Sequence, residues 1–584
     1  AHAGAAPAHL ELDATLDPAA RARAARATLE LGREAAEIAL AARFVVESFA
    51  VDGRRDAVPA TTRGGHHVWR LPAATRARRV EIAWRGTVDP LDEALSHRDT
   101  LRDARPVAGA RGSFLPAAAA WHPVVAGGLS GYRVAIDVPA GQKAIVPGRL
   151  VEEEESAARY RARFEFPHPS DGIDLMAGPY QVVNRGARTA LGTAVRLRTY
   201  FHPEIAALAD GYLDAVAGYL DLYEGWIGAY PFSGFSVVSS PTPTGFGMPT
   251  LTYLGIDVLR LPFIRATSLG HEVLHNWWGN GVLVEYARGN WSEGLTTFMA
   301  DYHYKERQGP AAAREVRLEW LRDFAALPPG EDRPLSRFVA RYHGASQIVG
   351  YNKAAMVFVM LREEIGREAF DAGIREFWKA NRFRVASWAD LRHAFERASQ
   401  RDLGGFFAQW VERAGAPAVR FAGAQATQRG GAWRVTVTLA QSRPAYQLRV
   451  PLRLRTAAMQ ILSLDGERTV ARFATAARPV ALLLDPDFRL FRRLAPDEAP
   501  PILREAMVRP DVALALVTDA ASADAARRLA AQLLDHPARP FAGGALPGGP
   551  LLAIGLDEDL DAWLARHGLP PPPAQVAGRG SGRM

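Results

Sequence analysis

The sequence predicts a multidomain α+β protein of 584 residues. Apolar and polar residues alternate with a period of two in the first third of the chain. Helical spacing of apolar residues follows, and period two returns after residue 416. A chain of this length is expected to hold several domains with separate cores. The predicted divisions are an N-terminal β-rich domain (1–197), a mostly helical domain (198–416), a β-sandwich (417–497), a small α/β unit (498–568) and a disordered tail (569–584).

The first two divisions differ in periodicity. Runs such as RVEIAWRG and YRVAIDVP alternate strictly and are separated by glycine and proline, which is typical of half-buried strands. In the second division the apolar residues recur every three or four positions, which predicts amphipathic helices. Besides a helix pair around residues 271–308, helices are expected at 205–227, 311–327, 351–365, 367–380, 388–399 and 404–413.

The last divisions return to strands and then mix the two patterns. WRVTVTLAQ, YQLRVPLRLRTA and RPVALLLDP predict the strands of the β-sandwich. The following segments, DVALALVTD, ADAARRLAAQLLDH, GPLLAIGLD and EDLDAWLARHG, predict the order strand, helix, strand, helix. The proline-rich end, PPPPAQVAGRGSGRM, cannot bury a core and is expected to be disordered.

Residues 271–298 contain the candidate metal ligands. His271 and His275 are four apart on an expected helix, so both imidazoles can reach one ion. Glu293 lies in the first turn of the next expected helix, about 292–308. Two neutral imidazoles and one carboxylate, with a fourth position open, make a three-ligand catalytic zinc site. We therefore predict one Zn²⁺ per chain on these three residues; the alternative is a pair of core helices with incidental histidines.

The motif resembles a known family. HEVLHNWWGN, followed by Glu293-Gly294, is similar to the M1 (gluzincin) zinc metallopeptidases, as in a divergent bacterial-type member. The family places about 18 residues between the second histidine and the glutamate, and this chain has one fewer, within YARGNWSE. The resemblance implies a thermolysin-like catalytic domain for residues 198–416. It also implies peptide hydrolysis with Glu272 as the general base.

Tyr351 is assigned a role from the same resemblance, and Thr297 from its position after Glu293. Gly350-Tyr351-Asn352-Lys353-Ala354 is similar to the family's Y-x-K-G-A segment, so Tyr351 is the candidate donor to the oxyanion. FFAQWVERAGAPAV (406–419) is similar to the family's exit from the catalytic domain. Thr297, one turn after Glu293, is a candidate second-layer hydrogen-bond partner for a ligand imidazole, with capping or packing as the alternative.

One departure concerns substrate binding. The family holds the substrate's free amine with the glutamate of a G-x-M-E-N segment, and the matching substrate-binding residues here are Gly247, Met248 and Pro249. Proline has neither a charge nor a backbone donor. Three hypotheses follow: an aminopeptidase with a rebuilt amine site, using Glu285 or Asp257; an endopeptidase or a peptidase of modified peptides; and a non-catalytic peptide-binding protein.

Composition limits the partners. The chain is 48% hydrophobic and 23% charged, and no apolar run approaches the ~20 residues that span a bilayer. The net charge of +7 comes from scattered arginines, so a peptide or protein substrate is expected and nucleic acid is not. Cysteine is absent, which excludes disulfides and thiol catalysis. We interpret Ala1 as the N-terminus of a mature, exported chain. The expected location is the periplasm or the exterior of the cell, and the alternative is the cytoplasm. The sequence leaves the oligomeric state open.

Overall fold

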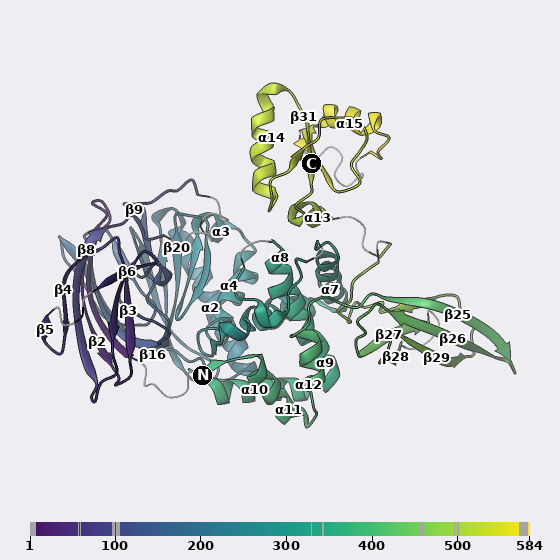
Figure 1. The fold of residues 1–584 in the computed structure, drawn as a ribbon, viewed down its shortest axis with the longest axis horizontal. Helices are drawn as coiled ribbons and strands as arrows, with labels where there is room; N and C mark the ends of the chain where they lie inside the picture. Colours follow the sequence, from purple (N-terminus) through teal and green to yellow (C-terminus); the bar gives the residue numbers. More distant parts are fainter. Residues whose placement is uncertain are drawn as a thin grey trace. The chain divides into compact units, whose positions relative to one another are not determined.

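The computed structural model describes residues 8–55, 58, 60–95, 100, 105–328, 330–341, 344–454, 459–495, 497–498, 502–571 and 582–583. By its internal contacts the chain forms two compact units. The first holds residues 1–284 and 371–386, and the second holds residues 285–370 and 387–584. The protein is multidomain and α+β, as the sequence predicts (Figure 1). The predicted domain boundaries stay predictions.

The first unit begins with a β-rich region built on an eight-stranded sheet of order β15-β16-β13-β1-β2-β8-β4-β5. The strands β1 and β8 alternate buried and exposed residues, so that Leu10 and Leu12 on β1 face the same core as Ile82 and Trp84 on β8. The predicted period-two runs are therefore half-buried strands. The strands of this sheet are β1 (Ala8–Asp17), β2 (Ala22–Leu31), β4 (Val45–Val51), β5 (Arg54–Arg55), β8 (Arg78–Thr87), β13 (Ser130–Pro139), β15 (Arg149–Glu155) and β16 (Arg159–Ser170).

Two smaller sheets complete this region. One is four-stranded, with the order β12-β3-β7-β6, and the other is five-stranded, with the order β14-β17-β11-β10-β9. Their strands are β3 (Ala36–Ala41), β6 (Thr61–Arg63), β7 (His66–Leu71), β9 (Asp89–Pro90), β10 (Val107–Gly109), β11 (Gly112–Leu115), β12 (Val124–Val125), β14 (Lys143–Ile145) and β17 (Leu175–Gly178), with the short helix η1 (Ala117–Ala119) between β11 and β12.

The same unit contains the sheet that leads into the zinc motif. This sheet has the order β18-β19-β20-β22-β21, so β21 is an edge strand and pairs antiparallel with β22. Among the described residues, one side of the β21 backbone therefore has no strand partner. The elements are β18 (Gln181–Arg188), β19 (Ala194–Phe201), β20 (Gly234–Ser240), β21 (Gly245–Met248), β22 (Leu251–Gly255), the helices η2 (Pro203–Leu208), α2 (Ala209–Trp226), α3 (Ile256–Arg260), η3 (Ile264–Ala266) and α4 (Ser268–Leu274), and the pair β23 (Leu283–Val284) and β24 (Val385–Ala386).

The second unit begins with helices. A continuous helical run covers residues 292–308, and its middle turn is a π-helix. A second π-helix, η7, precedes α9. The elements are η4 (Tyr286–Arg288), α5 (Ser292–Thr297), η5 (Phe298–Tyr302), α6 (His303–Gln308), α7 (Pro310–Ala325), η6 (Leu335–Arg337), α8 (Gly344–Gln347), η7 (Ile348–Lys353), α9 (Ala354–Ile365), α10 (Arg367–Asn381, shared between the units), α11 (Trp388–Ser399) and α12 (Gly404–Trp410).

The predicted helices agree with these elements to within a few residues. The helix predicted at 388–399 is α11, which begins with a reciprocal capping box between Ser387 and Asp390. The prediction at 404–413 is wrong at its end, because α12 stops at Trp410. Among the described residues, no helix is both long and apolar enough to span a membrane.

Two three-stranded sheets follow the helices, with the orders β25-β26-β29 and β28-β27-β30. On β26, Val435, Val437 and Leu439 are buried while alternate residues are more exposed, as expected for one face of a sandwich. The strands are β25 (Val419–Arg429), β26 (Ala432–Gln441), β27 (Leu448–Leu454), β28 (Met459–Leu464), β29 (Arg468–Thr475) and β30 (Leu482–Leu484).

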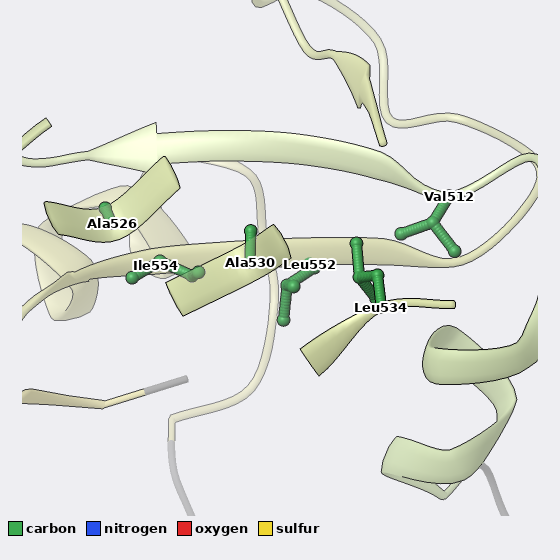
Figure 2. Close-up of a cluster of buried hydrophobic side chains, with 6 residues drawn as sticks. All are labelled: Val512, Ala526, Ala530, Leu534, Leu552 and Ile554. Carbon is green, nitrogen blue, oxygen red and sulfur yellow. The ribbon is translucent and has the colours of Figure 1, made fainter. Parts of the chain in front are cut away.

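The C-terminal α/β unit has a sheet covered on both faces. Alternate residues of β31 and β33 contribute to two separate clusters, one against α14 and one against α15. Figure 2 shows the α14 cluster, in which Ala526, Ala530 and Leu534 lie with Val512, Leu552 and Ile554. The sheet order is β32-β31-β33-β34. The elements are α13 (Leu503–Val508), β31 (Ala513–Val517), α14 (Ala520–Leu533), β32 (Arg539–Pro540), β33 (Leu551–Leu556), α15 (Asp557–Arg566) and β34 (Gly582–Arg583).

This arrangement confirms the predicted order of strand, helix, strand and helix. The two helices appear on opposite sides of β31 (Figure 1). Most of the predicted disordered tail, residues 572–581 and 584, lies outside the described residues. Within the tail, Gly582–Arg583 pairs antiparallel with β33.

Candidate metal centre

Three predicted ligands are brought together. One ligand atom from each of His271, His275 and Glu293 lies within 4.8 Å of the other two. His271 is on α4, His275 ends that helix, and Glu293 is in the first turn of α5. The two imidazole rings are 4.9 Å apart between centroids and tilted by 76°. Two nitrogens and one carboxylate oxygen are the donor set of a catalytic zinc site, so the three residues fit this ion in the kind and number of their ligand atoms.

His275 is buried and its ring is oriented by the backbone. Its Nδ1 lies 2.9 Å from the carbonyl oxygen of Trp278. Because a carbonyl can only accept, Nδ1 carries the proton and donates, which leaves Nε2 with a lone pair for a metal. The tryptophan is fully buried, so the carbonyl is fixed by the packing of the turn after α4. A hydrogen bond of this kind sets the tautomer and direction of a metal-binding histidine.

The edge strand β21 passes directly against the zinc motif. A Cβ atom added to Gly247 would lie 2.5 Å from Oε2 of Glu272 and 3.0 Å from Cδ2 of His275. Carbon cannot approach an oxygen or another carbon this closely, so only glycine fits here without a shift. The backbone of the predicted substrate-binding segment therefore lies beside the predicted general base.

The residues after Gly247 are bonded to the segment that follows the C-terminal end of α4. Met248 is buried and Pro249 is partly exposed. The amide of Thr250 donates to Oδ1 of Asn276 over 2.8 Å, and Asn276 directly follows His275. Thr250 has a φ of 64°, a left-handed conformation that is uncommon outside glycine. A hydrogen bond thus fixes the turn that carries Pro249 to the metal-binding segment.

Glu293 is positioned by the start of α5. Oδ1 of Asn290 accepts from the amide of Ser292 over 3.0 Å and from its hydroxyl over 2.7 Å. The side-chain amide of Asn290 donates to the carbonyl of Val339 over 3.0 Å. Asn290 thus satisfies the first amide of α5 and anchors the start of this helix to the chain near residue 339.

Gly294 brings α5 against the helix that follows Tyr351. A Cβ on Gly294 would overlap the Cβ of Ala354, the first residue of α9. Tyr351 lies three residues earlier on η7, partly exposed, with its ring 6.1 Å from that of Phe338 between centroids. The elements that carry Glu293 and Tyr351 are therefore in direct contact. The role of Tyr351 as oxyanion donor stays a prediction. Its π-helical backbone was not foreseen from the sequence; such turns are frequent at functional sites.

Lys353 is a buried structural residue two positions after Tyr351. Its Nζ lies 3.2 Å from Oδ1 of Asp332 and 3.3 Å from the carbonyls of Arg413 and Gly415. Burial lowers the pKa of this amine, and the carboxylate of Asp332 opposes that shift. Asp332 also accepts from the amide of Gly415. Lys353 thus ties η7 to the W-x-x-x-x-G exit segment, a role that the sequence did not reveal.

The predicted role of Thr297 is not seen. Its hydroxyl is buried and has no hydrogen-bond partner among the described residues, so it does not orient a ligand imidazole in this structure. For His275 the backbone carbonyl of Trp278 already occupies that position. The role of Thr297 therefore stays a prediction, because sequence spacing places it one turn from Glu293 but does not say which group faces each ring nitrogen.

Two acids considered as replacements for the family's glutamate have other partners. Asp257 pairs with Arg260 at 3.1 Å, and its side chain is 93% exposed. Glu285 lies 3.4 Å from the guanidinium of Arg288. An exposed, ion-paired carboxylate binds an ammonium weakly, because water and the arginine compete for it. The carboxylate that a Cβ on Gly247 of β21 would meet is that of Glu272.

Comparisons with known proteins agree with this geometry. The profile of the peptidase family M1 domain matches residues 265–410, which include the three predicted ligands. Aminopeptidase N of Caulobacter vibrioides is 28% identical over 275 residues, which cover 44% of this chain and 31% of that protein. The chain therefore spans about a third of the length of this curated relative.

Solved structures share the fold. An M1 zinc metallopeptidase from Deinococcus radiodurans aligns with a TM-score of 0.55 at 21% identity, over 70% of this chain and 95% of that one. Aminopeptidase A of Legionella pneumophila, in complex with aspartic acid, aligns with a TM-score of 0.65 at 15% identity. The alignment covers 85% of this chain and 60% of that one.

Proposed function

We propose that this chain, which belongs to the M1 peptidase family, is a zinc-dependent peptidase of aminopeptidase type with an altered site for the substrate's free amine. The observation that carries this proposal is the convergence of His271, His275 and Glu293 within 4.8 Å. The two histidines and the glutamate that bind zinc in the M1 peptidases are all present in this chain. Their presence argues against a non-catalytic peptide-binding protein. The family's zinc is the cofactor that these residues fit.

The zinc, when bound, supplies a Lewis acid for water and for the scissile carbonyl. Glu272 is the base that takes the proton from the attacking water and returns it to the leaving amine. Tyr351 is the proposed donor of a hydrogen bond to the oxyanion, a contact typically worth about 3–4 kcal/mol. His275 needs no reorientation, because its Nδ1 is already held by Trp278.

The edge strand β21 supports an extended peptide as the substrate. A peptide can pair with the free side of an edge strand, with backbone hydrogen bonds that do not depend on sequence. Gly247 places such a peptide next to Glu272, because no side chain separates this backbone from the carboxylate. The substrate class proposed is therefore a peptide in extended conformation.

A second candidate is favoured by Pro249. The family's carboxylate for the substrate amine is replaced by an uncharged side chain, and Asp257 and Glu285 pair with neighbouring arginines. Without a carboxylate at that position, a peptide with a blocked amine loses little on binding. The alternative is an endopeptidase, or a peptidase that acts on modified peptides, with the same chemistry.

Replacement of the general base tests the proposal. Glu272→Gln should keep one zinc per chain and the melting temperature, yet lose nearly all peptide hydrolysis, because an amide cannot accept the water's proton. The matched control is Glu319→Gln, an exposed position on α7. Hydrolysis of a peptide mixture is followed by mass spectrometry beside metal analysis of the same samples. Full activity in the Glu272 variant, or none in the parent, would contradict the proposal.

Export is a separate proposal. The expected location is the periplasm or the exterior, and fractionation of cells that express the full-length gene tests it. Recovery of the protein with cytoplasmic markers would contradict export.

A further inference from the structure

A cavity lies behind the turn that carries Pro249, inside the first compact unit. Its volume is about 270 Å³, and its walls come from the start of β15, from β19, from the start of β20 and from Thr250. No carboxylate is among the described residues that line it, whereas Arg149, Arg196 and Arg198 are. A small molecule fits a volume of this size, close to the lower end of known ligand sites.

The three arginines leave a positive charge that their partners do not cancel. Arg149 pairs with Glu165, and Arg198 pairs with Glu153 at 2.9 Å. Arg196 is exposed and makes no ion pair among the described residues. Both glutamates also serve other donors, since Glu165 pairs with Arg133 and Glu153 accepts from Tyr160.

Arg198 is the decisive group. It is 5% exposed, and only its Nη2 has a hydrogen-bond partner, while Nε and Nη1 are buried without one. The hydroxyl of Tyr200, another wall residue, is also buried without a partner, and the Arg198 guanidinium lies 5.2 Å from its ring centroid. Buried donors without acceptors are costly and rare in native proteins. A guanidinium with two free donors beside a free hydroxyl calls for an acceptor with several oxygens.

We propose that this cavity is a binding site for a small oxyanion, a carboxylate or a phosphate. The Nε and Nη1 groups of Arg198 flank the Nη2 that is bonded to Glu153, so an oxyanion can accept from either of them while the Glu153 pair stays intact. Arg149 and Arg196 add charge at the mouth, where both side chains are exposed. The Tyr200 hydroxyl supplies a neutral donor from the wall.

The cavity is connected to the metal-binding segment by hydrogen bonds. The hydroxyl of Thr250 accepts from the amide of Gly148, another wall residue, over 2.7 Å. The amide of the same threonine donates to Asn276, which follows His275. The proposed anion would therefore contact the residue that holds the Pro249 turn in place.

Calorimetric titration of the zinc-loaded full chain tests the site. The probes are inorganic phosphate, N-acetylglycine as a carboxylate, and N-acetylglycinamide as its neutral counterpart, at constant ionic strength. We expect saturable binding of one equivalent of at least one anion and none of the amide. Arg198→Met should weaken that binding at least about tenfold, since a charge-assisted pair is lost. The tighter of the two anions identifies the source of the oxyanion.

Two further variants keep the test decisive. Arg196→Met removes an exposed charge without an ion pair, so the fold should be unchanged and binding should weaken about threefold, as for a partly screened charge. Arg163→Met, on β16 and paired with Glu152 outside the cavity, is the control with the same change of charge and should stay within about twofold. Melting temperatures show whether each variant folds.

Three results would overturn the proposal. One is the absence of binding by either anion. Another is anion binding that survives both Arg198→Met and Arg196→Met, which would place the anion at the metal centre. The third is an equal loss of binding in Arg163→Met, which would show a general effect of net charge. None of these outcomes depends on whether the chain hydrolyses peptides.

Discussion

The two sides of the candidate site differ in what they retain from the family. On the metal side, His271, His275 and Glu293 are all present and lie within 4.8 Å of one another. On the substrate side, the strand β21 lies against Glu272, and Pro249 stands where the G-x-M-E-N segment of the M1 peptidases has its glutamate. Under the proposed function, bond cleavage and recognition of the substrate's free amine are therefore separable.

The metal side should show the largest effect. His271→Ala removes one of three ligands, and zinc affinity should fall by orders of magnitude, with hydrolysis lost as well. Metal analysis after dialysis against a weak chelator measures this. His393→Ala, an exposed histidine on α11, is the control and should keep one zinc per chain. A full complement of zinc in a His271/His275 double variant would show that the ion binds elsewhere.

The oxyanion donor should give the next largest effect. Tyr351→Phe removes one hydroxyl, and turnover should fall about 10²–10³-fold with little change in KM, as for a contact made mainly in the transition state. Steady-state kinetics on a peptide substrate measures both constants. In the control, Tyr219→Phe, the lost hydroxyl donates to the carbonyl of Arg265 instead. Turnover within twofold of the parent would leave Tyr351 as a packing residue beside Phe338.

Much of the metal side could be predicted from the sequence, because its signals are local. The spacing of His271 and His275 follows from one helical turn, and Glu293 is in the first turn of the expected second helix. The position of Lys353 beside Asp332 could not be predicted, since the contact joins segments 21 residues apart through tertiary packing. The free hydroxyl of Thr297 shows the same limit, because helical spacing does not fix its neighbours.

The substrate side was predicted only in part, for a related reason. The loss of the glutamate at Pro249 is visible in the sequence. The contact of Gly247 with Glu272 depends on how a sheet edge packs on a helix 25 residues away in the chain. The π-helices at 298–302 and 348–353 also have no local signal, because their sequences fit an ordinary α-helix equally well.

Close packing between the helices of Glu293 and Tyr351 gives a third test. Gly294→Ala should destabilise the protein by about 1–3 kcal/mol, since the added Cβ overlaps that of Ala354. Chemical unfolding of the zinc-loaded chain measures the change, and adding Ala354→Gly should restore part of the loss. Gly218→Ala is the matched control, because it lies on helix α2 with open space around its Cβ. There alanine should stabilise by up to about 1 kcal/mol. Equal effects at both positions would contradict the close contact.

The substrate strand offers an internal pair of variants. Gly247→Ala should lower kcat/KM by about tenfold or more, because the new methyl group displaces Glu272 from its position. Gly245→Ala, two residues earlier on the same strand and face, meets only the side chain of Leu254 at an ordinary 3.6 Å and should be within about twofold of the parent. Both variants should keep their zinc. Equal activities would show that the strand does not constrain the base.

The smallest expected effect concerns the free amine itself. Acetylation of a peptide's N-terminus removes a positive charge, and an enzyme with a desolvated carboxylate for that charge would lose several kcal/mol of binding. Because Pro249 supplies no carboxylate, kcat/KM should change by less than about tenfold, or roughly 1.4 kcal/mol. A matched pair of free and acetylated peptides, with the cut position read by mass spectrometry, measures both the rate and the mode of cleavage. Longer peptides should be cut better than single-residue amides, since they can form additional backbone hydrogen bonds with β21. A thousandfold loss of kcat/KM on acetylation, with cuts only after the first residue, would show that another acid binds the amine. The chain would then be an aminopeptidase that requires a free N-terminus.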